Sequence, residues 1–314
     1  MNITYINEFL PWPKKSDEVR AHVSPFLNSN VVVSAAVSNS HYSKHVGTLS
    51  IKKVFKGEEY YITNNCKYKV NKNNFLILNL MQEYESYIES NESVESFSLF
   101  FYPKFAEQIL NNIVTSSDKL LEYPCGNNYY SQPIIFWEKL YDNESKVFPA
   151  LERIQKALND NPDMNYISEQ IYLVIENLIF TQRNLSSQIQ NIPSAKRSTK
   201  IELFKRLSIA KDYMDSCCME KISLSDVAKI SCMNEHYMLR EFKKIFKTTP
   251  YKYLTELRLN ESKKLLSSEE KSISEISSKC GYEYLSSFSQ AFYQRYGLSP
   301  AAFRANSLRK KVNF

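Results

Sequence analysis

An internal repeat in the last third of the chain most constrains what this sequence can fold into. The first copy runs from Ser223 to Leu254 and the second from Ser272 to Phe303. The offset between matching positions is 49 before a central turn (224 to 273) and 50 after it (242 to 292), because the second turn holds one extra residue. The matching positions are the apolar pairs Leu224 and Ile273, Val227 and Ile276, Phe242 and Phe292, Phe246 and Tyr296, the turn pair Cys232 and Gly281, and the stops Thr249-Pro250 and Ser299-Pro300.

Each copy predicts a short helix, a turn and a longer helix, which together form a helix-turn-helix motif. The hydroxyl of Thr249 or Ser299 can cap a following helix that begins with proline. Between the copies, Pro250–Leu266 is expected to be one helix that holds the two motifs at a fixed separation. If that separation is near one turn of DNA, two recognition helices can enter successive major grooves.

Charge is divided unevenly along the chain. Residues 1–199 hold 19 Lys and Arg against 21 Asp and Glu, whereas residues 200–314 hold 21 against 13, so the net charge of +6 is −2 plus +8. A basic segment after a slightly acidic one indicates a polyanion-binding module. With only five glycines, neither a GxGxxG nor a GxxxxGK[ST] phosphate loop occurs.

Residues from about 201 to 306 resemble the DNA-binding domain of the AraC/XylS family, named for the arabinose-operon regulator. Four positions depart from the family pattern: Cys232 and Lys247 stand where glycine is frequent, Ser277 replaces alanine, and Gln290 replaces a frequent arginine. The residues that carry the resemblance are Leu224, Val227, Ala228, Arg240, Phe242, Thr249-Pro250, Tyr253-Leu254 and Arg258 in the first copy, and Ile273, Ile276, Gly281-Tyr282, Phe288-Ser289, Phe292, Tyr296-Gly297, Ser299-Pro300 and Phe303-Arg304 in the second.

The resemblance implies which side chains meet DNA. Side chains near the start of each recognition helix, opposite its apolar stripe, are expected at base edges; these are His236, Leu239, Arg240, Ser286, Ser287 and Gln290. Phosphate contacts are expected from Lys243, Lys244, Thr249, Arg295 and Ser299. Arg240 has an alternative as a phosphate contact or as the ion-pair partner of Glu235 or Glu241, and His236 as a plain surface side chain.

The first hundred residues predict a strand-rich domain. Short β-branched and aromatic segments lie at 30–38, 49–56, 59–65, 67–80 and 95–102, separated by Asn, Gly and Ser. After Pro103, helices are expected at 103–113, 132–142 and 148–160. This half resembles the cupin-like barrel of the same family. The predicted fold class is therefore α+β with two domains, a cupin-like β-barrel with flanking helices and an all-α domain with two helix-turn-helix motifs.

The predicted barrel is a candidate effector site. Aromatic side chains that could stack on a small organic effector, or simply form core, are Tyr42, Phe55, Tyr61, Tyr68 and Phe75. At Lys72-Asn73-Asn74, where the family has a Pro-Gly-Asp corner, asparagines in the left-handed conformation are expected to supply the turn. His41 and His45, four apart on a strand, would lie over ~13 Å apart. No metal site and no cofactor is therefore expected.

A long apolar stripe precedes the basic segment. Because such a stripe exceeds what one barrel needs to cover, we expect it to form a homodimer seam, with burial in the domain core as the alternative; the residues are Ile167, Ile171, Val174, Ile175 and Leu178. The expected domains are 1–185 for the effector barrel and dimerisation, a polar linker at 186–200, and 201–314 for DNA binding.

These features favour a sequence-specific DNA-binding transcriptional regulator, not an enzyme, that responds to a small organic effector. The alternatives are a barrel that only dimerises or binds a protein partner, and a cupin-type enzyme tethered to DNA. Expected partners are double-stranded DNA, RNA polymerase if the protein activates, and a second copy of the chain. The six cysteines form no C-x-x-C pair, and the start of the sequence has no signal-peptide pattern. A reduced, cytoplasmic, nucleoid-associated protein is expected.

Overall fold

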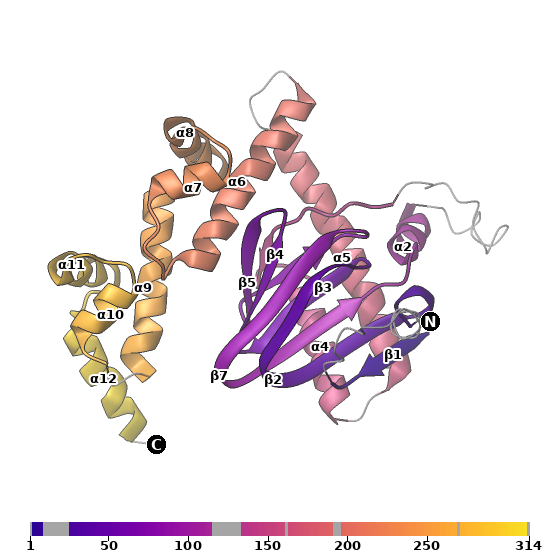
Figure 1. Ribbon diagram of the computed structural model, residues 1–314, viewed down its shortest axis with the longest axis horizontal. Helices are drawn as coiled ribbons and strands as arrows, with labels where there is room; N and C mark the ends of the chain where they lie inside the picture. Colours follow the sequence, from indigo (N-terminus) through magenta and orange to yellow (C-terminus); the bar gives the residue numbers. More distant parts are fainter. Residues whose placement is uncertain are drawn as a thin grey trace. The chain divides into compact units, whose positions relative to one another are not determined.

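The computed structural model describes residues 2–8, 25–114, 133–160, 163–190, 196–268 and 271–312. The chain divides into two compact units, Met1–Pro193 and Ser194–Phe314. Figure 1 shows a strand-rich first unit and a second unit made of helices. The expected α+β class with a sheet-rich first half and a helical second half is confirmed.

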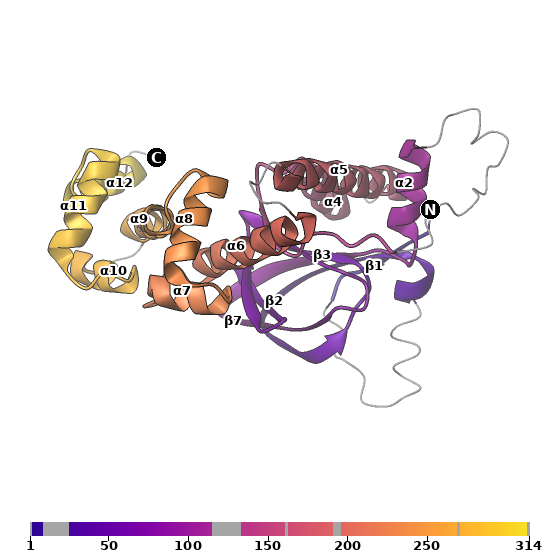
Figure 2. The same ribbon diagram turned by 90° about the horizontal axis from the view of Figure 1, so that it is seen from above.

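The first unit contains a sheet of eight strands. The strands are β1 (Ile3–Ile6), β2 (Asn30–Val46), β3 (Ser50–Lys56), β4 (Glu58–Thr63), β5 (Cys66–Asn71), β6 (Asn74–Leu78), β7 (Glu83–Phe100) and β8 (Leu140–Asp142). Their order is β1-β2-β7-β3-β6-β8, while β4 pairs with β5 and with the first half of β7. The strands β2 and β7 are longer than the sequence predicted, because they pair antiparallel along most of their length. The sheet is curled rather than flat (Figure 2).

Alternation along β3 separates two cores. Ile51 belongs to the core that packs against helices, whereas Val54 belongs to a second core on the opposite face of the sheet. On β6, Phe75 and Leu76 divide in the same way. The curled sheet thus has one face covered by helices and one face that lines its own interior.

Three helices cover the outer face of the sheet. They are α2 (Phe105–Val114), α4 (Phe148–Asp160) and α5 (Met164–Gln190). The predicted dimer seam on α5 is wrong, because its side chains are no more than 1% exposed and belong to the same core as Ile51 and Phe97. The five residues are Ile167, Ile171, Val174, Ile175 and Leu178. Because these side chains pack against α4 and the sheet, they are not accessible to a partner.

Two further sequence predictions are corrected in this region. The helix expected at 132–142 is absent from its described residues; Pro133–Glu138 has no regular structure and Leu140–Asp142 forms β8 beside β6. An edge position on the sheet outweighs the helical pattern there. The predicted linker 186–200 is shorter, because α5 continues to Gln190 and α6 begins at Arg197; residues 191–195 lie outside the described ranges.

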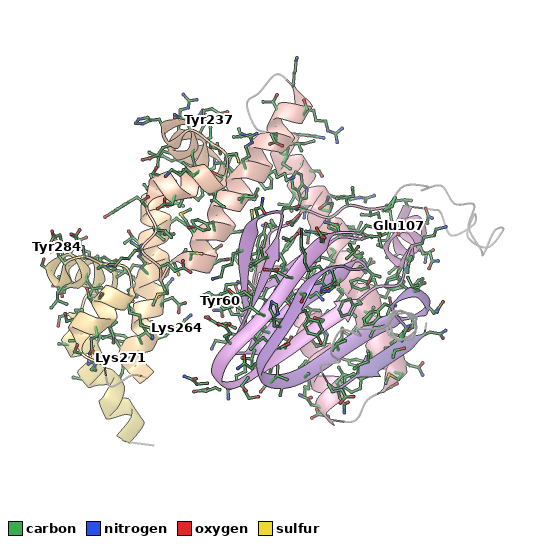
Figure 3. All side chains as sticks on the ribbon, in the orientation of Figure 1. Tyr60, Glu107, Tyr237, Lys264, Lys271 and Tyr284 are labelled. Carbon is green, nitrogen blue, oxygen red and sulfur yellow. The ribbon has the colours of Figure 1, made fainter. Side chains whose placement is uncertain are left out.

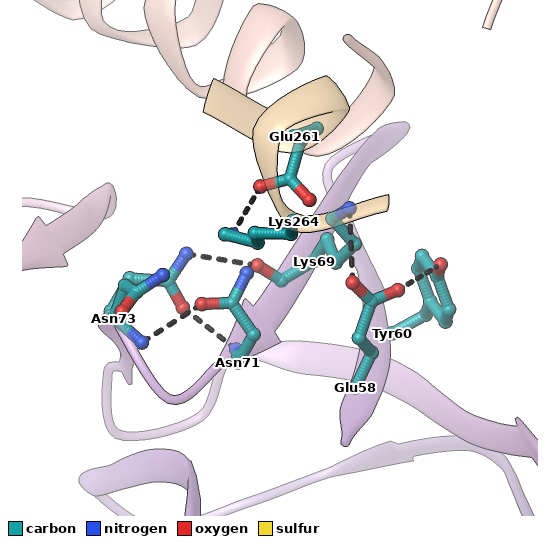
Figure 4. Close-up of polar contacts among 8 residues, drawn as sticks. Glu58, Tyr60, Lys69, Asn71, Asn73, Glu261 and Lys264 are labelled. Atoms are coloured by element: carbon teal, nitrogen blue, oxygen red, sulfur yellow. Dashed lines mark hydrogen bonds and ion pairs between the residues drawn. The ribbon is translucent and has the colours of Figure 1, made fainter. Parts of the chain in front are cut away.

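The corner between β5 and β6 forms without left-handed asparagines. Among the described residues, positive φ angles occur at Asn64 and Asn65, in the turn between β4 and β5, and not at Lys72, Asn73 or Asn74. Side-chain bonds make the corner instead: the Asn71 amide donates to Asn74 Oδ1 at 2.9 Å, and the Asn73 amide to Asn71 Oδ1 at 2.9 Å. Figure 4 shows these bonds beside the ion pair of Lys69 with Glu58.

The second unit contains seven helices in its described residues. They are α6 (Arg197–Cys217), α7 (Leu224–Ile230), α8 (Glu235–Phe246), α9 (Pro250–Ser268), α10 (Ile273–Lys279), α11 (Leu285–Tyr296) and α12 (Pro300–Val312). The second motif has its own core around Phe288 and Phe292. In the described part of the chain, no helix combines the length and apolar character that a membrane crossing requires.

Candidate nucleic-acid interface and effector cavity

The first helix-turn-helix consists of α7 and α8. Ser223 begins α7 with a capping box, since its hydroxyl accepts from the Asp226 amide while the Asp226 side chain accepts from the Ser223 amide. Cys232 makes the turn with a φ of 52°, and Asn234 caps α8 by accepting from the Tyr237 amide. Local signals therefore set where both helices begin.

The buried side of α8 is as the sequence predicted. Met238 and Phe242 are fully buried, and the opposite face is open. His236, Arg240, Lys243 and Lys244 are exposed and Leu239 is half-buried. The structure thus brings the five predicted contact residues of this helix to one accessible face.

Arg240 is held by its neighbours. Its Nε donates to Glu241 Oε1 at 2.8 Å, and its guanidinium lies 5.2 Å from the centre of the Tyr237 ring. Burial would raise the pKa of Glu241, but hydrogen bonds from Lys244 and Arg240 lower it, so this carboxylate stays charged. The Arg240 side chain remains 63% exposed, so it is oriented and still open to a ligand.

The second motif consists of α10 and α11. Ser272 and Glu275 form the same capping box as in the first motif, and Gly281 makes the turn with a φ of 74°. The predicted base-reading residues Ser286, Ser287 and Gln290 are all exposed. Unlike α8, α11 has no side-chain cap at its first turn.

The helices that follow each motif begin as predicted. The Thr249 hydroxyl accepts from the Lys252 amide at 3.2 Å, and the Ser299 hydroxyl accepts from the Ala302 amide at 3.2 Å. Both caps are therefore confirmed. Arg295, the predicted phosphate contact of α11, pairs with Glu256 of α9 at 2.6 Å and is half exposed.

Helix α9 joins the two motifs (Figure 1). Arg258 donates from Nε to the Cys218 carbonyl and from Nη2 to the Glu220 carbonyl, at 3.0 and 3.2 Å. A Cβ atom on Gly281 would lie 2.7 Å from Nη2 of the same side chain. Arg258 thus bonds α9 to the turn after α6 and packs closely against the turn of the second motif.

Sequence reasoning missed several aromatic side chains on this surface. Tyr237 is 40% and Tyr284 62% exposed, and Figure 3 labels both on the surface of the second unit. Tyr251, at the start of α9, is 70% exposed. The sequence could have pointed to these rings, because each lies close to a predicted contact residue. Large exposed rings beside a basic helix suit contact with sugars and bases.

The first unit contains a partly open cavity of about 260 Å³ on the sheet face away from α4 and α5. Tyr42 and Tyr61 line it, as the sequence predicted. Tyr68 and Phe75 do not line it, because they pack into the two cores, and Phe55 packs against the helix-side core. The other wall residues that matter below are Lys52, Glu59, Tyr84 and Phe100.

Comparison with known proteins agrees with this geometry. A family described as helix-turn-helix domain matches residues 227–306, which contain both turns and both recognition helices. The C-terminal unit is an AraC-type helix-turn-helix domain.

The relatives of this AraC-type domain are named as regulators. The probable transcriptional regulator LumQ of Photobacterium leiognathi is 24% identical over 57% of the chain and 63% of its own length. The melibiose operon regulatory protein of Escherichia coli K12 is 30% identical over 30% of the chain and 32% of its own length. The chain therefore spans less than two thirds of the length of these curated relatives.

Two solved structures with distant similarity are the following. ToxT from Vibrio cholerae is 15% identical, covers 88% of the chain and 98% of its own, and has a TM-score of 0.35. The DNA-binding domain of AdpA in complex with a target DNA is 21% identical, covers 36% of the chain and 98% of its own, and has a TM-score of 0.31.

Proposed function

We propose that this protein is a sequence-specific DNA-binding transcriptional regulator. The observation that carries the proposal is the pair of helix-turn-helix motifs joined by α9. Two recognition helices on one rigid connector suit two successive major grooves. The excess of 21 basic over 13 acidic residues after position 199 favours a polyanion.

Within this proposal, α8 is the stronger reader. Arg240 can donate two parallel hydrogen bonds to a guanine, with His236 and Leu239 at neighbouring bases. Gln290 suits adenine, and Ser286 and Ser287 suit either base. Phosphate contacts come from Lys243, Lys244 and Arg295 and from the helix starts at Thr249 and Ser299.

The first unit holds a small organic effector in this proposal. A concave space with mostly apolar walls and a few buried polar groups is what a small-molecule site requires. This feature favours an effector-responsive regulator over one whose first unit only dimerises or meets a protein partner.

The test is a nuclease footprint of the full-length protein on the DNA upstream of its own coding sequence. We expect protection over two stretches about one helical turn apart on one face of the DNA. A protein that shifts all DNA fragments equally at low salt, with no footprint, would be a non-specific polyanion binder and not a regulator of this kind.

A further inference from the structure

The cavity of the first unit has a chemically uneven wall. Its apolar part includes Phe26, Val33, Leu80 and Met81, and its polar part gathers on β3, β4 and β7. An apolar cavity of about 150 Å³ holds benzene. About 260 Å³ therefore accommodates a ring with a short side chain or a comparable aliphatic molecule.

Lys52 supplies the decisive polar group. The residue is 3% exposed, and its Nζ makes one long hydrogen bond, to Ser98 Oγ at 3.4 Å. The same Nζ lies 3.8 Å from the centre of the Phe100 ring and 5.2 Å from that of Tyr84. An ammonium group has three donors. Within the described structure, aromatic faces take the place of the remaining acceptors.

Glu59 lies on the same wall but is not the hydrogen-bond acceptor of Lys52 Nζ. Its Oε2 accepts from Ser96 Oγ at 2.7 Å, and hydroxyls of Tyr61 and Ser86 also donate to it. Its carboxylate oxygens are thus occupied by hydroxyl donors. The buried lysine is left as the group on the cavity wall that lacks a strong acceptor.

We propose that this cavity binds a small amphipathic monocarboxylate, with the carboxylate against Lys52 Nζ and the apolar part against Phe26, Phe100 and Leu80. A cationic ligand would be repelled by the lysine, and a neutral ligand would offer it only an uncharged and therefore weaker acceptor. A ligand polar throughout would lose hydration against the apolar wall. The effector role of such an acid rests on the proposed function, but its binding does not.

Binding of the carboxylate is coupled to the protonation of Lys52. Burial lowers the pKa of Lys52 to about 7, against the opposing effect of the Glu59 charge, and burial raises the pKa of Glu59. The other titratable groups on the wall are Tyr42, Tyr61, Tyr84, His45 and Glu8, and burial raises the pKa of all three tyrosines.

The sign of the pH effect follows. Free Lys52 loses its proton as the pH rises through about 7, whereas a bound carboxylate keeps it charged. Ionised Glu59 also repels the ligand, so it acts in the same direction. Affinity is full between the ligand's own carboxyl pKa, about 4–5, and about pH 7, and it falls above that range by up to about tenfold per pH unit.

The experiment is calorimetric titration of the full-length protein, without DNA, with 3-phenylpropanoate, 3-phenylpropan-1-ol and 3-phenylpropylamine, and with hexanoate as an aliphatic acid. We expect both acids to bind at about pH 6.5, and the alcohol and the amine to bind at least about tenfold more weakly. At about pH 8.5 the acids bind more weakly, with uptake of a proton.

Lys52→Met should weaken acid binding by at least about tenfold. The matched control is Lys53→Met: Lys53 is also buried, but it donates to the Val54 and Asn71 carbonyls and lies over Phe148, away from the cavity. Thermal unfolding verifies that both variants are folded, and removal of the desolvated Lys52 should not lower stability.

Three results would overturn the proposal: equal affinity for the acid and the alcohol, unchanged acid affinity in folded Lys52→Met, or no binding of either acid at millimolar concentration. Because no DNA is present, each is separate from failure of the footprint, which would instead count against the regulator function.

Discussion

Two residues of the C-terminal unit adopt the left-handed backbone conformation without being glycine. Cys232 has a φ of 52° and Lys247 a φ of 60°, and their counterparts in the second motif are Gly281 and Gly297, with φ of 74° and 72°. A side chain in this region costs about 1–2 kcal/mol relative to the right-handed conformation. The first motif therefore carries strain that the second avoids.

This strain is measurable at the end of α8. Lys247→Gly should raise the free energy of unfolding by about 0.5–1 kcal/mol, because the relieved strain exceeds the entropy that glycine adds to the unfolded chain. Gly297→Ala should lower it by about 1 kcal/mol, since a Cβ there meets no atom within 4 Å and only the backbone is strained. Urea denaturation measures both. A loss on Lys247→Gly would mean that the bond from Lys247 Nζ to the Lys244 carbonyl outweighs the strain.

Arg240 tests base reading at a single position. Arg240→Ala should cost about 1–3 kcal/mol of binding free energy at the footprinted site and relax preference at one base pair. Arg240→Lys is the control, because it keeps the charge and loses the planar fork. Binding to a panel of single-base operator variants measures the effect. Equal losses on every sequence would assign Arg240 to a phosphate instead.

At the scale of elements, α5 shows that a long apolar stripe can be used entirely in the core of its own unit. The stripe is fully buried against the sheet and α4, so it stabilises the first unit and offers nothing to a partner. Phe180, outside the stripe, is an apolar side chain of this helix that is 43% exposed.

Ile171→Asp with Leu178→Asp should therefore unfold the first unit rather than produce a folded monomer, because two unpaired charges would enter its core. Circular dichroism measures the loss of secondary structure, and size-exclusion chromatography measures the size of the species that remains. Phe180→Asp on the same helix is the matched control and should leave the unit folded. A folded, smaller species from the double variant would restore the seam interpretation.

The two recognition helices should contribute unequally to DNA binding. Helix α8 offers Arg240 and His236 with two lysines one turn on, whereas α11 offers serines and Gln290. Charged donors contribute more than neutral ones, and lysines release counterions. At fixed salt, Arg240→Ala with His236→Ala should lose more specific affinity than Gln290→Ala with Ser286→Ala. The reverse order would make α11 the main base reader.

At the scale of the whole molecule, the chain has separate cores. Two clusters lie in the first unit, around Phe97 and around Tyr61, and another lies around Phe292 in the second. Units with separate cores can unfold independently.

Calorimetric unfolding of the full-length protein should show two transitions. Operator DNA should raise the transition temperature of the second unit only. The acid 3-phenylpropanoate should raise that of the first unit only, because each ligand binds one native unit. The double variant Ile171→Asp, Leu178→Asp identifies the first transition by removing it. A single transition shifted by both ligands would show that the units unfold as one.

The sequence by itself determined the C-terminal unit, because its signals are local. These signals lie within a few residues of the helices they control, and each occurs in both copies of the repeat. They are the helical period, the capping boxes at Ser223 and Ser272, and the caps at Thr249 and Ser299. The open face of each recognition helix followed from its period alone.

Only the tertiary structure decided what depends on distant partners. The stripe of α5 became core because a sheet formed far earlier in the chain covers it, and Leu140–Asp142 became a strand because β6 offered an edge. Lys52 and Lys53 are adjacent in sequence, and alternation alone turns one into the cavity and the other towards Phe148. Burial of a lysine depends on what the curled sheet encloses, and no local pattern carries that information.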